Sequence, residues 1–508
     1  MKILRISTGL YSYRDFAHLF DGPVCVTLTK KSLHNIRKSH KRLLKKINTG
    51  ETIYGVNTGF GNLSKIKIDL KDQKNLQLNL VRSHAAGVGN NLEPGLIRTI
   101  FILKLLTYVK GYSGIRPAVA EKIIQFLNND ILPVIPEKGS VGASGDLAPL
   151  GHMALALIGE GRVMYNGKEL KTKTALSKAN IKPLVLEQKE GLSLVNGTQV
   201  STALAIKSLL NGDLLLKTAD IAGALSVENS FASRKVFQKK IHALKKHPGQ
   251  ASVANNVYKL LNGSKIVKSH SNCGIVQDPY SFRCIPHIHG ASRDGFTRAA
   301  NMIDNEINSV SDNPIILENG DIVNSGHFHG EHVAQAMDFL AISFSELGAV
   351  SERRTHYFMK GVEGKFNLFV TKSPGVESGY MMAHVTASAL VSENKTLAHP
   401  ASVDSLPTSG GQEDLVSMAP WAGQKLLQIQ NNLRHILAVE LLVAGAANQI
   451  ASPNLTSGKG TLPVLNILKF LCKYHNGDRT LSGEIESIAK NIKSGEFVHA
   501  VTKNTILE

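Results

Sequence analysis

The sequence predicts a mainly α-helical fold, a bundle of long helices with a smaller mixed part at its N-terminal end. Three observations predict this fold. Apolar residues recur at helical spacing over long stretches, loops rich in Gly, Pro, Ser and Asn separate these stretches, and 508 residues with 43% apolar composition can bury a large core. We therefore divide the chain into an N-terminal part, 1–198, and a helical bundle, 199–508. The predicted long helices cover 199–226, 291–310, 330–357, 379–398 and 422–450.

The N-terminal part is expected to mix strands with helices. Residues 24–28, VCVTL, predict a short strand, and residues 161–170 predict a β-hairpin because an Asn-Gly pair lies between two strand-like runs. Residues 30–47 and 237–249 are rich in lysine, and their apolar residues recur at helical spacing. We expect solvated helix faces in both of these segments.

Charge and cysteine content limit the classes of function. The formal net charge of +18 suits a nucleic acid or an anionic substrate, but basic residues do not alternate with aromatic ones, so we expect no nucleic-acid partner. The sequence shows no signal peptide and no long uncharged apolar stretch, which predicts a soluble cytoplasmic protein without a membrane partner. The cysteines lack C-x-x-C spacing, which argues against a disulfide framework and a structural zinc site. They are Cys25, Cys273, Cys284 and Cys472.

Glycine, alanine and serine crowd residues 139–151, GSVGASGDLAPLG, immediately before an apolar run that predicts a helix. Ser144 does not lie on a G-x-S-x-G nucleophile elbow, because Asp146 follows Gly145. Neither G-x-x-x-x-G-K-[ST] nor G-x-G-x-x-G, the phosphate-binding patterns, is present. Taken alone, the segment is best interpreted as a tight turn capped by Asp146, with a helix starting at Leu147.

Further polar or glycine-rich segments interrupt the helical plan, and loops of this kind often carry chemistry. In one of them we expect Asp278 to cap a helix that has Pro279 in its first position, which places Tyr280 and Arg283 on one face. An isolated arginine in this setting is more often structural than functional, so the argument depends on the combination. The segments are YGVNTGFG (54–61), RSHAAGVG (82–89), KEGLSLVNGTQ (189–199), VQDPYSFRCIPHIHG (276–290) and LPTSGGQEDLVSM (406–418).

In this order, these segments resemble the aromatic amino acid ammonia-lyase family from about Tyr54 to about Ala451. The resemblance implies a helical bundle of the aspartase/fumarase-like type and a homotetramer whose active sites are shared between subunits. It implies non-oxidative deamination of a small-molecule amino acid, with conversion of L-histidine to trans-urocanate and ammonia as the leading reaction. A phenylalanine or tyrosine ammonia-lyase, or a 2,3-aminomutase, is the alternative. A basic binding protein on a degenerate lyase scaffold would have lost the Ala-Ser-Gly segment or Arg283, and neither is lost.

The resemblance also explains the small residues in 139–151. In this family an internal Ala-Ser-Gly, matched here by Ala143, Ser144 and Gly145, cyclises by itself into 4-methylideneimidazol-5-one, an electrophile, and no external cofactor is needed. The nitrogen of Gly145 must reach the carbonyl of Ala143, so bulky side chains would obstruct the reaction. The helix that follows is expected to direct the positive end of its dipole at the ring oxygen.

The remaining matches imply roles for individual residues. Tyr54 is the expected base, which requires its phenol pKa to fall from about 10, and Glu413 is the competing candidate. Arg283 is expected to bind the substrate carboxylate through two parallel hydrogen bonds. Asn196, Gln277 and Tyr280 match residues that orient the prosthetic ring and the substrate amine, and Phe328 matches a residue beside the ring.

Two positions are expected to select the substrate ring. His84 and Glu413 supply polar partners for both nitrogens of an imidazole. Tyrosine-selective relatives also carry a Ser-His pair, here Ser83-His84, so Glu413 carries more of this inference. The chain departs from many relatives at His327, where they have asparagine. We expect no metal site, although further histidines raise the question; these are His287, His289, His329 and His332.

Overall fold

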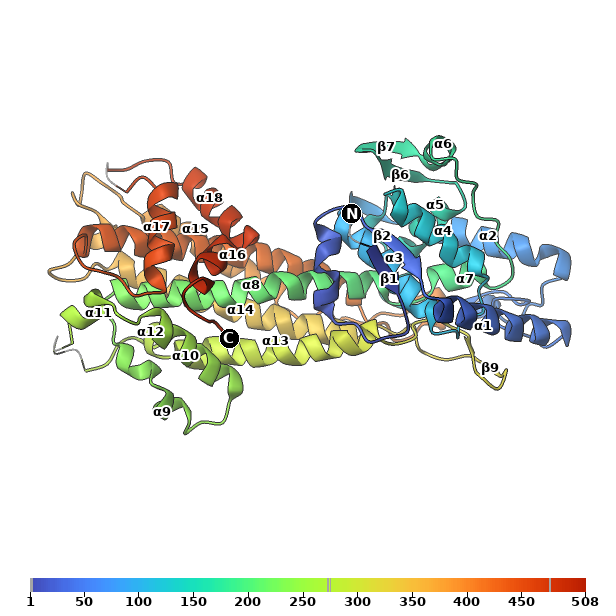
Figure 1. The fold of residues 1–508 in the computed structure, drawn as a ribbon, viewed down its shortest axis with the longest axis horizontal. Helices are drawn as coiled ribbons and strands as arrows, with labels where there is room; N and C mark the ends of the chain where they lie inside the picture. The colour runs from blue at the N-terminus through green and yellow to red at the C-terminus, as the bar shows by residue number, and fades with distance from the viewer. Residues whose placement is uncertain (1–2, 272–273, 275, 475–476) are drawn as a thin grey trace. The chain divides into compact units, whose positions relative to one another are not determined.

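The computed structural model describes residues 3–271, 274, 276–474 and 477–508 (Figure 1). Contacts divide the chain into two compact units. The first comprises Met1–Lys207, Ala300–Asp338 and Pro400–Gln424, and the second comprises Ser208–Ala299, Phe339–His399 and Lys425–Glu508. Four of the five changes of unit fall within a long helix, and the fifth, between His399 and Pro400, follows the end of a helix at Leu397. The division at residues 198/199 remains a prediction.

The first unit contains the strands of the described chain and several helices. Its strands are β1 (Ile3–Ile6), β2 (Cys25–Leu28), β3 (Val88–Asn91), β4 (Leu132–Pro133), β5 (Pro136–Lys138), β6 (Arg162–Tyr165), β7 (Lys168–Lys171), β8 (Ile315–Ile316) and β9 (Ile322–Val323). Its α-helices are α1 (Lys30–Asn48), α2 (Gln73–His84), α3 (Pro94–Val109), α4 (Pro117–Asn128), α5 (Leu147–Leu157), α6 (Thr172–Lys178) and α7 (Glu190–Val195). Its 3₁₀ helices are η1 (Tyr13–Phe20), η2 (Gly61–Leu63), η3 (Leu70–Asp72) and η6 (Ser409–Gly411).

The long helices and the second unit complete the fold. The helices that run through a change of unit are α8 (Gln199–Asn229), α13 (Ile285–Ile307), α14 (Glu331–Met359) and α16 (Ala419–Ala451). The second unit adds η4 (Arg234–Phe237), α9 (Lys239–His242), α10 (Pro248–Leu260), α11 (Lys265–Ser269), α12 (Tyr280–Arg283), η5 (Leu368–Val370), α15 (Met381–Leu397), α17 (Thr461–Leu471), α18 (Ser482–Ser494) and α19 (Glu496–Thr502). The predicted mainly helical class and the long helices are confirmed.

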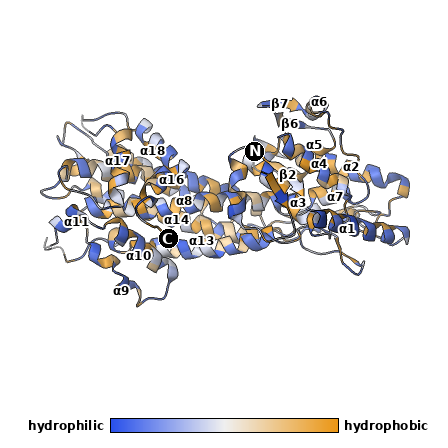
Figure 2. Cartoon of the chain, in the orientation of Figure 1, coloured by the Kyte–Doolittle hydropathy of each residue, from blue (hydrophilic) through white to orange (hydrophobic). Residues whose placement is uncertain are grey.

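Helix α3 forms the centre of the first unit. Every residue from Gly95 to Val109 is buried, which is the pattern of a helix surrounded by protein on all sides. Helix α1 is the opposite case, since it is largely blue in Figure 2 and buries only a narrow stripe that includes Ile36 and Leu43. Its lysines therefore form a solvated face, as its sequence predicts.

The sheets are small. β1 pairs with β2 in parallel, β3 with β5 and β8 with β9 antiparallel, and β4, β6 and β7 form an antiparallel sheet in the order β4-β6-β7. The predicted hairpin is confirmed: Asn166 and Gly167 connect β6 to β7 with φ of 52° and 72°, the positive values that a tight turn of this kind requires.

Two sequence-based helix predictions are wrong. Residues 237–249 do not form one helix, because Pro248 starts α10 as its first residue and only the four-residue α9 precedes it. Asp278 does not cap α12, because Pro279 occupies the cap position and the Asp278 carboxylate accepts a hydrogen bond from the Ser233 N–H at 2.8 Å.

Among the described residues, one helix meets the length and composition of a membrane span. This helix is α14, and it carries Asp338 and Glu346, so it is not a long uncharged stretch. In its apolar window, 61% of the residues are buried inside the protein, as in a core helix.

Candidate active site

The backbones of Gly145 and Gly197 touch in the first unit. The two residues form a parallel bridge, and the Asp146 N–H donates to the Gly197 carbonyl oxygen at 2.8 Å. A Cβ atom on Gly145 would overlap the Gly197 carbonyl group, and both glycines have positive φ, at 79° and 120°. Only glycine therefore suits position 145.

Both the backbone carbonyl and the side-chain hydroxyl of Ser144 make hydrogen bonds. Its carbonyl oxygen accepts from the Asn196 side-chain amide at 3.2 Å and from the Gly197 N–H at 3.4 Å. Its hydroxyl donates to Glu413 Oε1 at 2.7 Å, and the Thr408 hydroxyl donates to Glu413 Oε2 at the same distance. The structure thus brings three of the predicted site residues, Ser144, Asn196 and Glu413, into direct contact.

Asn196 follows α7 and is 2% exposed. Its side-chain oxygen is buried without a hydrogen-bond partner in the described chain. A buried polar atom without a partner is costly, so its presence beside Ser144 needs an explanation. The Asn196 side chain therefore has one free acceptor beside Ser144.

His84 is the last residue of α2 and faces the same region. Its Nδ1 atom lies 2.8 Å from the Leu80 carbonyl oxygen, so Nδ1 carries the hydrogen in that contact and Nε2 is left as an acceptor. Burial lowers the pKa of His84, whereas the Leu80 carbonyl and the charge of Glu413 act in the opposite direction. His84 and Glu413 therefore influence each other electrostatically, as the substrate-ring hypothesis requires.

Tyr54 lies half-buried in the loop before η2. Its phenol oxygen accepts a hydrogen bond from the Gly61 N–H at 3.0 Å. Asn62, the next residue, donates to the carbonyl oxygens of two residues of η6 at 3.0 and 2.9 Å. These bonds join the loop of Tyr54 to the loop that carries Glu413.

Phe328 is half-buried in the loop between β9 and α14. Its neighbour His329 lies close to the Glu413 loop, with Nε2 3.3 Å from the Leu415 carbonyl oxygen. The first unit therefore contains Tyr54, His84, Ala143, Ser144, Gly145, Asn196, Phe328 and Glu413.

The other predicted site residues form a separate group in the second unit. Arg283 donates to the Gln277 side-chain oxygen at 2.8 Å, and its guanidinium lies 4.7 Å from the centre of the Tyr280 ring. Tyr280 is 70% exposed and Gln277 is also exposed. The predicted proximity of Tyr280 and Arg283 is confirmed, and the Arg283 Nε–H is buried without a partner in the described chain.

The additional histidines have separate partners. His289 is buried against Asp220 at 3.0 Å, and the His287 ring packs against His242 with 5.8 Å between ring centres. His327 contacts the Ser325 hydroxyl at 2.8 Å. Within the described ranges, no three His, Cys, Asp or Glu side chains are grouped so as to hold a metal ion.

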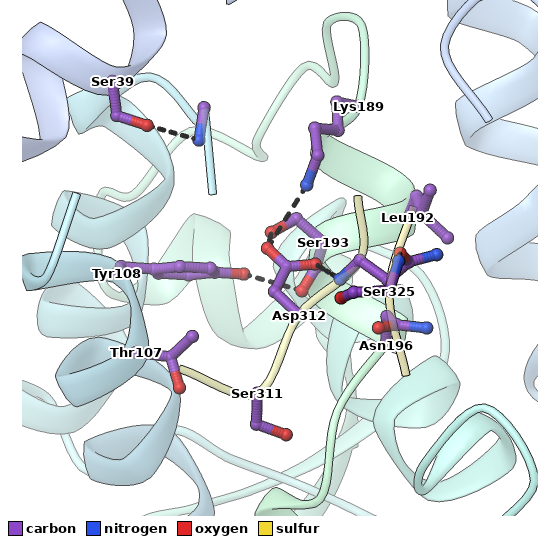
Figure 3. A network of polar contacts seen from close by, with 12 residues as sticks. Ser39, Thr107, Tyr108, Lys189, Leu192, Ser193, Asn196, Ser311, Asp312 and Ser325 are labelled. Atoms are coloured by element: carbon purple, nitrogen blue, oxygen red, sulfur yellow. Dashed lines mark hydrogen bonds and ion pairs between the residues drawn. The ribbon is translucent and has the colours of Figure 1, made fainter. Parts of the chain in front are cut away.

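Sequence reasoning missed a buried network of charged residues beneath Asn196. Lys189 Nζ lies 3.3 Å from Asp312 Oδ2, and that oxygen also accepts from the Ser193 hydroxyl at 2.6 Å (Figure 3). Lys104 Nζ donates to the carbonyl oxygens of Asn196 at 2.6 Å and Ser193 at 3.0 Å. The sequence feature that could have revealed this network is Lys104, a lysine inside the apolar run FILKLLTYV (101–109).

Asp146 also differs from the sequence expectation. It precedes α5 as predicted, but its carboxylate makes no capping bond to that helix. It accepts instead from the Ser201 N–H at 2.8 Å and the Ser201 hydroxyl at 2.6 Å, in the first turn of α8. Burial raises the pKa of Asp146 to about 6, and the Ser201 hydrogen bonds oppose this change.

Comparisons with known proteins identify the family of this chain. A family model described as "Aromatic amino acid lyase" matches residues 11–469. Histidine ammonia-lyase from Vibrio cholerae is 44% identical over 488 residues, which cover 96% of this chain and 95% of that protein. The crystal structure of histidine ammonia-lyase from Trypanosoma cruzi is similar with a TM-score of 0.90 at 33% identity, covering 99% of this chain and 95% of that one. Tyrosine aminomutase from Streptomyces globisporus has a TM-score of 0.92 at 32% identity, with 99% and 100% covered.

Lys104 gives a prediction for the pH dependence of stability. Burial lowers its pKa from 10.5 to about 7, although Asp312 and Asp146 act in the opposite direction. Between pH 7 and 10.5 the unfolded chain therefore binds one more proton than the folded chain, so the free energy of unfolding rises with pH, by about 1.4 kcal/mol per pH unit at most. Lys104→Met removes this contribution. We expect the wild-type free energy of unfolding to increase relative to that of Lys104→Met as the pH is raised through this window.

The measurement is chemical denaturation of both proteins at several pH values and one protein concentration. Lys41→Met, at an exposed position of α1, is the matched control for loss of one positive charge. A wild-type to Lys104→Met difference that stays constant across the window would contradict the prediction.

Proposed function

Because this chain belongs to the aromatic amino acid lyase family, we propose that it eliminates ammonia from L-histidine, without oxidation, and releases trans-urocanate. The observation that carries the proposal is the contact of Ser144 with Asn196 and Glu413 at the place where Gly145 touches Gly197. The reaction breaks a C–H bond at the β-carbon and the C–N bond at the α-carbon, and forms a C=C bond between them. Curated relatives named histidine ammonia-lyase support this assignment of substrate.

The electrophile is proposed to be 4-methylideneimidazol-5-one formed from Ala143-Ser144-Gly145, with no external cofactor and no metal. The Gly145 nitrogen bonds to the Ala143 carbonyl carbon, whose oxygen leaves as one water with the two amide hydrogens. Ser144 loses its hydroxyl and its α-hydrogen as a second water, which leaves a methylidene carbon. The glycine contact and the free acceptor on Asn196 suit this group. It supplies an electrophilic carbon that captures the substrate amine, which otherwise leaves poorly.

Asn196 and Gly197 supply the electrostatic support. Their N–H groups both point at the Ser144 carbonyl oxygen, where negative charge develops when electrons are drawn toward the segment. Donors fixed in advance around such an oxygen are among the largest contributions to catalysis. Loss of the Ser144 hydroxyl on cyclisation also removes one hydrogen-bond partner from Glu413, which leaves that carboxylate oxygen free to accept from a substrate.

Substrate binding is proposed to use the second-unit group. Arg283 would hold the substrate carboxylate with two hydrogen bonds, and Gln277 and Tyr280 would orient the amine. The exposure of Tyr280 in the single chain supports a homotetramer in which a neighbouring subunit completes each site. We propose a cytoplasmic location on the same family resemblance.

The imidazole ring is proposed to lie between His84 and Glu413. Glu413 is a half-buried acceptor, and His84 Nε2 is left without the hydrogen that Nδ1 uses toward Leu80. Two acceptors of this kind suit the protonated imidazole ring, which carries an N–H on each nitrogen. Phe328 would pack beside the prosthetic ring. The similarity to tyrosine aminomutase keeps a tyrosine or phenylalanine lyase, or an aminomutase, as the alternative.

Ser144→Ala tests the electrophile through the product. The change removes one hydroxyl, so the fold should persist, but no methylidene carbon can form. We expect wild-type protein incubated with L-histidine to release urocanate and ammonia in equal amounts, and Ser144→Ala to lose nearly all of this activity. The measurements are urocanate absorbance, ammonia release and the helical circular dichroism signal. Release of a β-amino acid without ammonia would instead establish the aminomutase alternative.

Tyr54→Phe separates the two candidate bases. The variant loses the proton acceptor and keeps the ring, so we expect kcat for histidine to fall at least a hundredfold, the usual scale for a lost general base. Arg283→Lys is the comparison, because it should chiefly raise KM by weakening carboxylate capture. If Tyr54→Phe retained near wild-type turnover, Glu413 would be the base.

Glu413→Gln tests substrate choice. A carboxylate facing a benzene ring in a closed site would be desolvated without a partner, whereas it gains one from imidazole. Wild-type protein should therefore prefer histidine over phenylalanine by about 10⁴ in kcat/KM, and Glu413→Gln should lower the histidine value and narrow the gap. The assay is the appearance of each unsaturated acid from histidine, tyrosine and phenylalanine. Wild-type preference for tyrosine or phenylalanine would overturn the histidine assignment and leave the ammonia-lyase assignment intact.

A further inference from the structure

Lys104 is a buried lysine for which the proposed reaction has no assigned role. It lies in α3 with 0% exposure, and its Nζ atom donates to the carbonyl oxygens of Asn196 at 2.6 Å and Ser193 at 3.0 Å. Burying a lysine is costly unless its charge is paired and hydrogen-bonded. Its hydrogen bonds go to two backbone carbonyls, so we expect its role to lie in the position of that backbone.

The Asn196 carbonyl belongs to the same peptide unit as the Gly197 N–H. A trans peptide unit is planar, so its C=O and N–H groups point in opposite directions. Lys104 binds the oxygen side at 2.6 Å, and the N–H side reaches the Ser144 carbonyl oxygen at 3.4 Å. The Lys104 amino group therefore fixes the direction in which the Gly197 N–H points.

A hydrogen bond to an amide oxygen also polarises the amide and strengthens its N–H as a donor. Hydrogen-bonded chains in proteins strengthen one another by perhaps 10–30% per bond. The chain here runs from the Lys104 amino group through the 196–197 peptide unit to the Ser144 carbonyl oxygen.

We propose that Lys104 is a positioning residue for Ala143-Ser144-Gly145, and that it acts through the peptide unit between Asn196 and Gly197. It promotes cyclisation by holding the Ser144 carbonyl in place, and it promotes turnover by strengthening a donor to that oxygen. The inference rests on the proposed function, since it requires the segment to cyclise.

Tyr108 provides the comparison that separates this role from a purely structural one. Its hydroxyl donates to the Ser193 carbonyl oxygen at 3.1 Å, at the same end of α7, one helical turn from Lys104 on α3 (Figure 3). The structure gives Tyr108 no bond to the Asn196 carbonyl. Tyr108→Phe therefore weakens the end of α7 and leaves the peptide unit of Asn196 and Gly197 bound to Lys104.

The test compares Lys104→Met, Tyr108→Phe and wild type by intact mass and by kinetics. In Lys104→Met we expect a smaller fraction of chains to have lost two waters at a fixed time after synthesis. For the cyclised fraction, kcat for histidine should fall roughly tenfold to a hundredfold, below the full effect of deleting such a donor, with KM within about twofold. Tyr108→Phe should match wild type in both measurements.

Lys104→Gln keeps an N–H donor on a shorter side chain and should give intermediate values, so it replaces Lys104→Met in the test if Lys104→Met does not fold. Wild-type values in Lys104→Met, or in Lys104→Gln where Lys104→Met does not fold, would overturn the proposal. Equal losses in Lys104→Met and Tyr108→Phe would also overturn it. Failure of the proposed function would give a different result. The wild-type protein itself would then have the full mass of its sequence, without the loss of two waters.

Discussion

The contact between the backbones of Gly145 and Gly197 is the constraint on which the rest of the site depends. A side chain at position 145 would overlap the Gly197 carbonyl, and the left-handed φ of both residues disfavours any other amino acid. The same contact brings the Gly197 N–H to the Ser144 carbonyl oxygen and the Asp146 N–H to the Gly197 carbonyl. The close contact of the two backbones therefore keeps side chains away from the segment that is proposed to cyclise. It also places a hydrogen-bond donor, the Gly197 N–H, at that segment.

The surroundings of this contact break several rules that stable cores obey. An amide oxygen of Asn196 is buried without a partner in the described chain, and a lysine is buried among apolar residues of α3. Each of these features costs stability, and each lies within two hydrogen bonds of Ser144. Costly features of this kind beside a candidate site are expected where function, not packing, selects the residues.

Much of the fold follows from local sequence, whereas the contacts of the site do not. Asn166-Gly167 predicts its hairpin because two residues determine the turn, and the long helices follow from apolar periodicity. Residues 237–249 mislead because Pro248 starts a new helix, and Asp278 misleads because it binds Ser233, a residue far along the chain. Lys104 was missed for the same reason, since its partners, the carbonyls of Ser193 and Asn196, lie 89 and 92 residues further along the chain and only folding places them together. The motifs identify the site residues, but local sequence cannot show which of them touch.

The central claim is that Ala143-Ser144-Gly145 becomes an electrophile in the active protein. The most direct measurement is the mass of a proteolytic peptide that spans residues 139–151, taken from protein that converts histidine, with fragmentation to locate any change. The account predicts a peptide lighter than its genetic sequence by two water molecules, with the loss confined to these three residues, and no such loss in Ser144→Ala. A peptide of unaltered mass from fully active protein would contradict it.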